Sequence, residues 1–509
     1  MMTSDTLDLP GMEPIHPAGL RSVRGRIAVV AALNPSLDDD PMGEAFCEAH
    51  SAAERRPFGI TLTPAWLVAQ MLKRAAADQY DTIVDCGAGS GRFALAAARA
   101  CPRAHVLAVE SHPQMARLLR ERVQQSGLAS RIAVIEGDFR TLALQTHGRT
   151  LWLGNPPYVR HHDIAPAWKD WYRQGMAGLG IAASQLAGLH AHFMLRAVQQ
   201  MRAGDGLCFV TAAEWLDNRY GQALRRLCLA PGLRVEGLWL ADADDAVFDD
   251  ALVSAAVLQL CADNRVDGAQ LGRIAGRGLH TLRRVAMPAL AQSPRWSEFA
   301  REHMPELGTG TALGDLFRIT RGQVTGLNTA WVLPAHQRLL PERLTVPAVT
   351  RAREIIDDVI SRPADLAQLK RVACLPRDLD TLMPDDRLAA DAFIVLARRA
   401  GADKSYVAMQ RRPWHWLDLR EPPAALVSYM GRRPPVFRAN PQRLTFLNIA
   451  HGLYPRQPLP SGLLPRLLSH LNQAVDVHSG RVYGGGLVKF EPSDIARLRL
   501  PMSWMDTSR

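Results

Sequence analysis

The clearest chemical signal in the chain is the run Asn155-Pro156-Pro157-Tyr158, which directly follows a short apolar stretch expected to be a strand, residues 151–154. Two consecutive prolines cannot donate to a sheet ladder, and the first restrains Asn155 to an extended conformation. The resulting stiff corner presents the Asn155 side-chain oxygen and the Pro156 carbonyl as fixed acceptors. Acceptors aimed at the hydrogens of a conjugated amine help its nitrogen to act as a nucleophile. Tyr158 offers a flat face for the ring that carries the amine; a plain Pro-Pro loop is the alternative.

A glycine-rich turn, Asp85 to Phe93, follows an earlier expected strand and opens a helix. Its glycines allow a tight turn and a close approach of backbone to a ligand. Glu110 stands 25 residues after Asp85, at the end of the next expected strand, where its carboxylate could accept hydrogen bonds from two ribose hydroxyls. The pair Asp138-Phe139 ends the strand after that. By itself the turn also suits a nicotinamide or flavin dinucleotide, or a purely structural role.

These residues stand at the ends of apolar segments that alternate with amphipathic helical stretches. The expected strands are residues 82–85, 105–110, 131–138, 151–154, 206–211, 235–241 and 254–261. Such alternation implies an α/β fold in which a parallel sheet has helices on both faces. Right-handed crossovers then leave a crevice at the carboxyl ends of the strands, where the winding reverses. The alternation fades after about residue 265, which indicates a second domain.

Charge is distributed unevenly along the chain. Residues 1–308 hold 32 basic and 32 acidic side chains, whereas residues 309–509 hold 28 and 18, so the net charge of +10 lies entirely in the second part. This asymmetry favours a polyanionic partner for that part. A solvated basic face that keeps the protein soluble is the alternative.

Taken together, the motifs resemble the S-adenosylmethionine-dependent DNA adenine-N6 methyltransferases of the γ arrangement, in which the catalytic domain precedes a target-recognition domain. The likeness extends from about Phe58 to Pro501. It implies a Rossmann-like class I methyltransferase domain over residues 51–300, whereas the mixed composition of residues 1–50, with Asp38-Asp39-Asp40 and several prolines, predicts a partly disordered N-terminal arm. Residues 301–509 are then a mixed α+β domain that recognises the DNA target.

The resemblance also implies the residues that bind S-adenosylmethionine. The matching positions are Thr63, Asp85, Gly87, Gly89, Glu110, Asp138 and Phe139. Thr63 looks like part of the family's N-terminal element, which closes over the methionine end of the cofactor. Glu110 matches the ribose ligand, and Asp138 with Phe139 matches the pair that holds the cofactor's adenine.

The matching catalytic positions are Asn155, Pro156, Tyr158 and Phe248. The resemblance implies an adenine rotated out of duplex DNA, because the duplex hides its amino group. The base would stack on Tyr158 and against Phe248, while Asn155 and the Pro156 carbonyl accept the two amino hydrogens. No side chain is predicted to act as a strong general base.

Several features leave alternatives open. Cys86 stands where the γ enzymes commonly carry a proline. The same tetrapeptide occurs in methyltransferases that act on ribosomal RNA adenine or on a glutamine amide, so it specifies the planar amine and not its carrier. The basic second domain favours double-stranded DNA. A non-catalytic nucleic-acid-binding relative is a further alternative, although every recognisable catalytic position is filled.

Other patterns indicate what the protein lacks. The N-terminus carries no secretory signal, no stretch approaches the ~18 apolar residues needed to span a membrane, and seven scattered cysteines contain no Cys-x-x-Cys pair. We therefore expect a cytoplasmic protein without a disulfide framework.

No metal site is predicted at the histidines 161, 162, 190 and 192 or at the aspartates of residues 242–250. None of the five lysines completes an acidic-x-Lys triplet typical of restriction nucleases. Any paired cleavage would belong to a separately encoded restriction endonuclease.

Overall fold

The computed structural model describes residues 40–241, 247–248, 254–263, 265, 267–300, 310–337, 339–475, 480–483 and 487–500. The chain divides into two compact units. The first comprises Met1–Met304 with Tyr483–Gly485, and the second comprises Pro305–Val482 with Gly486–Arg509.

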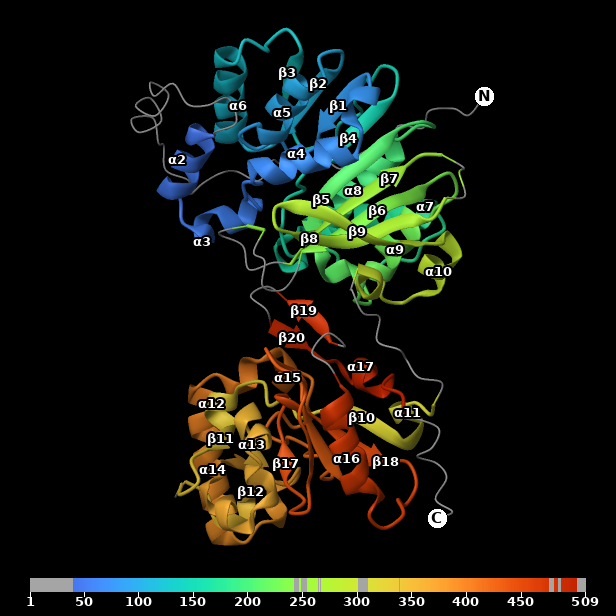
Figure 1. The fold of residues 1–509 in the computed structure, drawn as a ribbon. Helices are drawn as coiled ribbons and strands as arrows, with labels where there is room; N and C mark the ends of the chain where they lie inside the picture. The colour runs from blue at the N-terminus through green and yellow to red at the C-terminus, as the bar shows by residue number, and fades with distance from the viewer. Residues whose placement is uncertain are drawn as a thin grey trace. The chain divides into compact units, whose positions relative to one another are not determined.

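A nine-stranded sheet forms the centre of the first unit, in the order β3-β2-β1-β4-β5-β7-β6-β8-β9 (Figure 1). Its strands are β1 (Thr82–Asp85), β2 (His105–Glu110), β3 (Ile132–Glu136), β4 (Thr150–Gly154), β5 (Gly206–Ala212), β6 (Arg234–Ala241), β7 (Ala255–Cys261), β8 (Ala269–Ala275) and β9 (Gly278–Val285). Strands β1 to β5 pair in parallel, whereas β7 is antiparallel to both β5 and β6.

The α/β fold class and the seven expected strands are confirmed, but β7 runs antiparallel to its neighbours where a parallel strand was expected. All but the last residue of β7 are buried. A strand that is buried on both faces is apolar along its whole length. This pattern does not reveal whether the strand runs parallel or antiparallel to its neighbours. Strands β8 and β9 add an antiparallel hairpin after the alternation has faded. Gly276 and Arg277 form its two-residue turn with φ of 52° and 59°, the left-handed conformation that tight hairpins need.

Helices cover both faces of this sheet. The helices of the first unit are α2 (Pro41–Ala49), α3 (Ala52–Arg55), α4 (Ala65–Arg74), α5 (Arg92–Ala100), α6 (Pro113–Gln125), α7 (Pro166–Gly178), α8 (Leu189–Gln200), α9 (Gly221–Cys228) and α10 (Met287–Gln292). Ile83 packs into the cluster formed with α4 and α5, whereas its neighbour Val84 packs into the cluster formed with α7, α8 and α9. Successive strand residues therefore stabilise opposite layers, as the two-residue period of a strand requires.

Residues 40–50 depart from the predicted N-terminal arm. They form helix α2, whose first turn is capped by the Asp40 carboxylate and carries Pro41 at its first position. Met42 and Phe46 are buried against α6. The remainder of the predicted arm, residues 1–39, lies outside the described residues.

The described residues outside the large sheet form three further sheets. Their strand orders are β10-β18-β14-β16, β11-β13-β12-β17 and β15-β20-β19. The strands are β10 (Phe317–Arg321), β11 (Val332–Leu333), β12 (Thr345–Val349), β13 (Arg371–Ala373), β14 (Ala425–Ser428), β15 (Met430–Gly431), β16 (Phe437–Ala439), β17 (Thr445–Phe446), β18 (Ala450–Pro455), β19 (Arg481–Tyr483) and β20 (Leu487–Lys489). The helices are α11 (Leu313–Leu316), α12 (Asn328–Trp331), α13 (Ala352–Ile356), α14 (Pro384–Arg399), α15 (Tyr406–Met409), α16 (Leu463–Ala474) and α17 (Pro492–Ala496).

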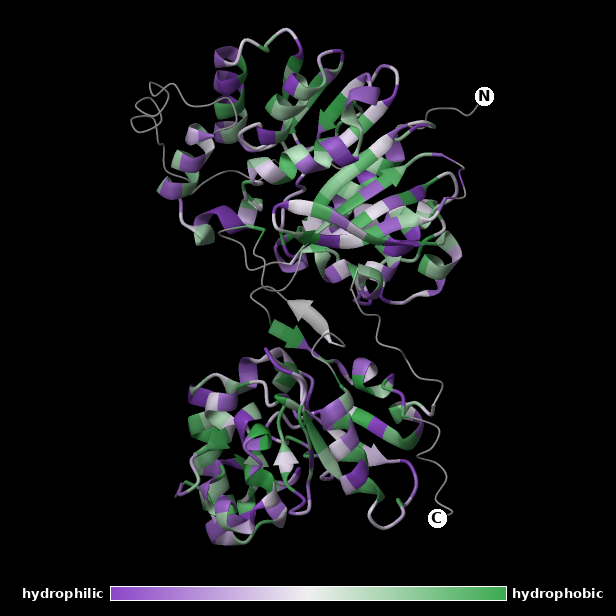
Figure 2. Cartoon of the chain, viewed as in Figure 1, coloured by the Kyte–Doolittle hydropathy of each residue, from purple (hydrophilic) through white to green (hydrophobic). Residues whose placement is uncertain are grey.

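Hydrophobic residues are concentrated in the strands of the large sheet and alternate with hydrophilic residues along the helices (Figure 2). All seven cysteines are free thiols. Within the described part of the chain, no helix combines the length and apolar character needed to cross a bilayer.

Candidate active site

The predicted site residues stand along one edge of the large sheet. Asp85 ends β1 and Glu110 ends β2, while Asp138 follows β3 by two residues. Asn155 directly follows β4. Because β3, β2, β1 and β4 are consecutive parallel neighbours, their carboxyl ends share this edge. The chain winds outward in opposite directions from β1 and β4, which is where open α/β sheets form a ligand crevice.

The glycine turn lies against the proline corner. A Cβ atom at Gly87 would stand 3.7 Å from Pro157 Cδ and 3.9 Å from the Asn155 carbonyl oxygen. Gly89 has φ of 54° and open space where a side chain would begin. The two motifs, about 70 residues apart in the sequence, therefore form one site with room in front of the turn.

Cys86, the residue that departs from the γ pattern, has a structural role in this turn. Its backbone N–H donates to the Leu153 carbonyl at 3.1 Å and so links the end of β1 to β4. A proline has no N–H and could not make this bond. The cysteine side chain itself is buried, and burial raises its pKa well above the ordinary value.

The Asn155 side chain is held at one end and unpaired at the other. Its Nδ2 donates to the Thr61 carbonyl at 3.3 Å. Its Oδ1 is buried without a hydrogen-bond partner. An acceptor left in this state costs on the order of 1–3 kcal/mol. The arrangement therefore offers a preformed acceptor to a donor that is not part of the described chain.

The segment that carries Thr61 packs directly on the tetrapeptide. Gly59 has φ of 66°, and a Cβ atom there would lie 2.6 Å from Tyr158 N and 2.7 Å from Pro157 Cβ. Thr63 is buried, and its carbonyl accepts a hydrogen bond from Arg92 Nη1 at 3.0 Å. The N-terminal element predicted to cover the cofactor thus contacts the proline corner.

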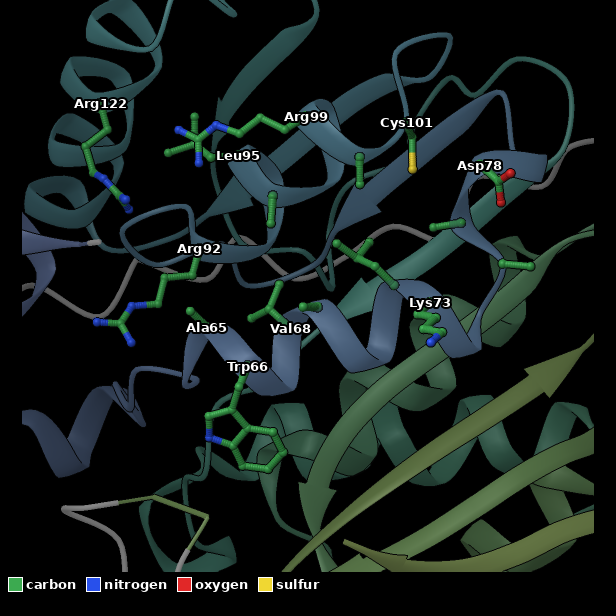
Figure 3. A pocket seen from close by; sticks show the side chains of 16 residues that line it. Ala65, Trp66, Val68, Lys73, Asp78, Arg92, Leu95, Arg99, Cys101 and Arg122 are labelled. Atoms are coloured by element: carbon green, nitrogen blue, oxygen red, sulfur yellow. The ribbon is translucent and has the colours of Figure 1, made fainter. Parts of the chain in front are cut away.

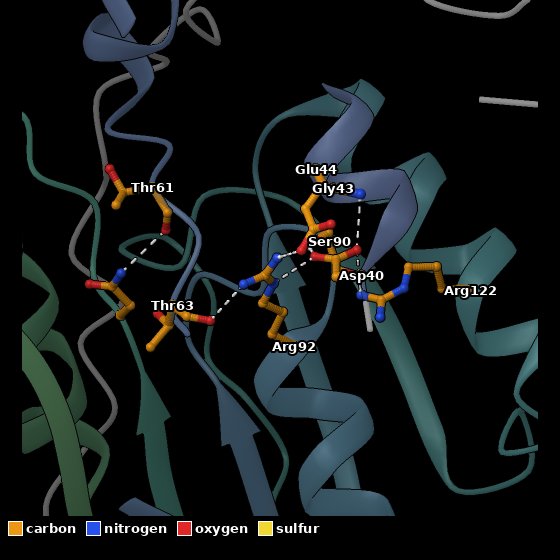
Figure 4. Close-up of polar contacts among 9 residues, drawn as sticks. Asp40, Gly43, Glu44, Thr61, Thr63, Ser90, Arg92 and Arg122 are labelled. Carbon is orange, nitrogen blue, oxygen red and sulfur yellow. Dashed lines mark hydrogen bonds and ion pairs between the residues drawn. The ribbon is translucent and has the colours of Figure 1, made fainter. Parts of the chain in front are cut away.

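A buried polar network anchors this N-terminal element, and it was not predicted (Figure 4). The Asp40 carboxylate lies 2.8 Å from Arg92 Nε and 3.0 Å from Arg122 Nη1, and it also accepts hydrogen bonds from Ser90 Oγ and Gly43 N. Arg92 connects the network to Thr63. The Asp-Pro pair at residues 40–41 was a usable signal, because Asp at an N-cap followed by Pro marks a helix start.

The two predicted aromatics lie together. The Tyr158 and Phe248 ring centroids are 6.0 Å apart at an interplanar angle of 74°. Tyr158 Oη donates to the Val210 carbonyl at 3.4 Å. Phe248 is buried, so its ring supports Tyr158 edge-on.

The acidic residues differ in their surroundings. Burial, with a contribution from Glu110, raises the pKa of Asp85 to about 8. Asp85 Oδ2 accepts from Ala94 N at 3.0 Å, while Oδ1 is buried and unpaired. Glu110 accepts from Gly89 N and His112 N, both at 2.7 Å, and burial raises its pKa. The site therefore concentrates carboxylates that would pair favourably with a cationic ligand.

The last predicted cofactor pair separates into two environments. Asp138 is partly exposed and forms an ion pair with Arg140. Phe139 is buried in the core, with ring centroids 6.0 Å from Trp152 and 5.3 Å from Phe193. Its contact with a cofactor remains a prediction, whereas its packing contribution is direct.

A cavity of about 810 Å³ lies elsewhere, between α4, α5 and α6 (Figure 3). Trp66, Arg92, Arg99 and Arg122 are among its lining residues. None of the residues predicted for cofactor binding or catalysis lines it. The strand ends that carry the predicted residues, and not this cavity, are therefore the candidate active site.

Within the described residues, no cluster of three or more His, Cys, Asp and Glu side chains is placed to hold a metal ion. His190 and His192 are buried, and the His192 ring stacks on Tyr172 with centroids 4.8 Å apart. The acidic segment of residues 242–250 falls outside the described residues except for Val247 and Phe248.

Comparison with protein families gives matches over residues 83–231 and 301–509. Residues 301–509 match the C-terminal domain of type II methyltransferase M.Eco57I. Residues 149–231 match the Eco57I restriction-modification methylase family, and residues 83–174 match a general methyltransferase domain.

The chain is 39% identical over 496 residues to type II methyltransferase M.XamI of Xanthomonas campestris pv. amaranthicola, covering 96% of this chain and 92% of that protein. It is 21% identical over 369 residues to type II methyltransferase M.AccI of Acinetobacter calcoaceticus, covering 67% of each. Its fold is similar to that of the type IIL restriction-modification enzyme MmeI in complex with DNA, with a TM-score of 0.60 and 12% identity over 89% of this chain and 70% of that one. The chain therefore belongs to the type II DNA methyltransferases of restriction-modification, and its cofactor is S-adenosylmethionine.

Proposed function

We propose that this type II methyltransferase methylates N6 of an adenine that is rotated out of duplex DNA. The observation that carries this proposal is the buried, unpaired Oδ1 of Asn155, which lies at the end of β4 beside the glycine turn. An exocyclic amino group on an aromatic ring suits both this acceptor and the Tyr158 ring, because the amine can donate to the oxygen while its ring stacks on the tyrosine.

The strand-end carboxylates fit the cofactor. S-adenosylmethionine supplies an electrophilic methyl group on a positively charged sulfur. The unpaired Asp85 Oδ1 is available to a cationic group, and Glu110 stands where a ribose ligand is expected. Thr63, Gly87, Gly89, Asp138 and Phe139 complete the proposed set.

The proposed chemistry needs little from the protein beyond orientation. Asn155 Oδ1 and the Pro156 carbonyl accept the two amino hydrogens, which directs the nitrogen lone pair toward the methyl donor. Burial raises the pKa of Tyr158, so its hydroxyl stays neutral and does not serve as a base. The proton that the methylated amine loses passes to solvent.

Base rotation is part of this proposal because stacked and paired adenine cannot reach the corner. Extrusion costs a few kcal/mol. Stacking on an aromatic side chain returns on the order of 1–3 kcal/mol per base. The Tyr158 ring, supported edge-on by Phe248, is the surface proposed for that contact.

Duplex DNA is the proposed substrate rather than RNA or protein. The charge excess of residues 309–509, 28 basic against 18 acidic side chains, supports a polyanionic partner. Kinship with M.XamI and the similarity of residues 301–509 to the M.Eco57I C-terminal domain favour DNA among polyanions. Restriction, if it accompanies this activity, is proposed to reside in a separately encoded endonuclease.

The test is transfer of radiolabelled methyl from S-adenosylmethionine to duplex DNA, ribosomal RNA and protein, followed by nuclease digestion and mass spectrometry of the nucleosides. We expect label in DNA alone, as N6-methyladenine at one sequence context, and strongly reduced label with the Asn155→Ala variant. Label confined to RNA or to protein, or a methylated cytosine as the product, would contradict the proposal.

A further inference from the structure

The Asp138 carboxylate is oriented by a single neighbouring side chain. Arg140 Nε lies 3.0 Å from Oδ1 and 3.1 Å from Oδ2, and Arg140 Nη2 lies 2.5 Å from Oδ2. The Arg140 backbone N–H adds a fourth bond to Oδ1 at 2.9 Å. Within the described residues, every hydrogen bond that this carboxylate accepts comes from Arg140.

Arg140 is itself fixed in place. Its side chain is only 7% exposed, against 30% for that of Asp138. The guanidinium Cζ lies 3.7 Å from the centroid of the Trp168 ring, in the first turn of α7. Trp168 in turn meets Trp171 edge-on, with ring centroids 5.5 Å apart. The indole therefore supports the face of the guanidinium, and the N–H edge of the guanidinium holds the carboxylate.

This arrangement differs from an ordinary surface ion pair. Exposed pairs sample many geometries and contribute little. Here a planar, buried guanidinium forms a bidentate contact, which fixes the plane of the carboxylate as well as its position. The exposed remainder of the Asp138 carboxylate keeps lone pairs free for one further donor.

We propose that Arg140, supported by Trp168, is a positioning residue that sets the Asp138 carboxylate to read the 6-amino group of the cofactor's adenine. The inference rests on the proposed role of Asp138 as an adenine ligand. A fixed carboxylate accepts a hydrogen from a 6-amino group but repels the oxygen of a 6-oxo purine. Sites built around such a donor–acceptor match discriminate strongly against the mismatched analogue.

The support also links two parts of the site. Helix α7 begins eight residues after Tyr158, so the segment that carries the catalytic corner leads directly into the helix that supports Arg140. The adenine subsite and the corner thus share one structural element.

The experiment compares binding of S-adenosylhomocysteine with that of S-inosylhomocysteine, its 6-oxo counterpart, by isothermal titration calorimetry. The variants are Asp138→Asn, Arg140→Lys and Trp168→Ala, with Trp168→Phe as the control that keeps a flat ring. We expect the full-length wild type and Trp168→Phe to prefer the adenine ligand. Asp138→Asn should lose that preference. Arg140→Lys keeps the positive charge but not the two-pronged guanidinium contact, and it should reduce the preference at least tenfold. Trp168→Ala, which removes the ring that supports the guanidinium, should reduce it as well. A general loss of packing would weaken both ligands equally and leave their ratio unchanged.

Two results would overturn the inference. One leaves the proposed role of Asp138 intact, and the other contradicts it. If Arg140→Lys retains the wild-type ratio while Asp138→Asn loses it, Arg140 does not position the carboxylate, and the proposed function stands. If Asp138→Asn itself retains the ratio, the adenine role of Asp138 fails as well. Thermal unfolding of each variant identifies any that does not fold. Lysine is chosen at position 140 because it keeps a positive charge against the Trp168 ring and so limits the loss of stability.

Discussion

The side-chain nitrogen of Asn155 donates a hydrogen bond to the Thr61 carbonyl, 94 residues earlier in the chain, at 3.3 Å. This bond fixes which end of the amide carries the oxygen, because the Thr61 carbonyl can only accept. Asn155 Oδ1 is consequently turned to the other side, where it is buried and unpaired. The acceptor proposed for the target amine is therefore oriented by a segment outside the tetrapeptide Asn155 to Tyr158.

Replacing Asn155 with alanine should strongly reduce methyl transfer while sparing cofactor binding. Loss of one preorganised hydrogen-bond partner costs about 10²–10³ in turnover. Single-turnover methylation and calorimetric titration with S-adenosylmethionine separate the two effects. Undiminished turnover in this variant would rule out the proposed mechanism.

Tyr158 should contribute through its ring and not through its hydroxyl. Tyr158→Ala is expected to weaken duplex binding and turnover by about 10- to 100-fold, in line with stacking of ~1–3 kcal/mol per base. Tyr158→Phe keeps the ring and should remain within about threefold of wild type, because removing the 3.4 Å hydrogen bond to Val210 costs ~1 kcal/mol or less. Fluorescence of 2-aminopurine at the target position reports base extrusion. Equal signals for the wild type and the alanine variant would argue against stacking.

A methyl group at Gly59 should disturb the proline corner, Asn155 to Tyr158, specifically. Its Cβ would collide with Tyr158 N at 2.6 Å in addition to the strain of a φ of 66°. Gly180→Ala provides the matched control, because Gly180 has φ of 72° but open space at its Cβ position. Both variants should lose ~1 kcal/mol of unfolding free energy to backbone strain, and only Gly59→Ala should also lose methylation. Equal activity of the two variants would show that the contact has no catalytic consequence.

Asp40 should stabilise the first unit. Its carboxylate is 1% exposed and pairs with Arg92 and Arg122, so Asp40→Ala leaves two largely buried guanidiniums without this partner. The expected loss is about 3 kcal/mol in the free energy of unfolding. Glu44→Ala removes a pair to Arg92 whose carboxylate is 60% exposed, and it should cost under about 1 kcal/mol. Chemical denaturation measures both; similar losses would contradict the buried-network interpretation.

Cofactor binding should release a proton near neutral pH. With a pKa raised to about 8, Asp85 is mostly protonated in the free protein at pH 7. A cationic ligand favours the ionised form and lowers this pKa, so affinity should rise from about pH 6 to pH 7.5. Calorimetry in two buffers of different ionisation enthalpy counts the protons. In Asp85→Asn, fewer protons should be released on cofactor binding, because this group can no longer ionise. If the affinity for the cofactor decreased over this pH range, the proposed ionisation of Asp85 would be wrong.

Much of the first unit could be predicted because its information is local. The strands ending at Asp85, Glu110 and Gly154 begin and end within a residue of the expected positions. Each is a short apolar run bounded by turn residues, which is a pattern within a few residues. The stiff corner at Asn155 to Tyr158 likewise follows from proline geometry alone.

Contacts between distant segments could not be obtained in this way. The direction of β7, the anchoring of Asp40 on Arg92 and Arg122, and the rotation of the Asn155 amide toward Thr61 all join residues far apart in sequence. Their free energies depend on burial and on the geometry of partners that only folding brings together.

The sequence by itself determined the α/β layout, the order of acidic residues at the strand ends and the chemistry that the proline corner can offer. Only the tertiary structure decided that the glycine turn lies beside that corner, that the Asn155 oxygen has no hydrogen-bond partner among the described residues, and that Arg140 holds Asp138. The physical reason is that strand and turn preferences are properties of short segments. The pairing or isolation of a buried polar atom, in contrast, is decided by whichever groups pack around it.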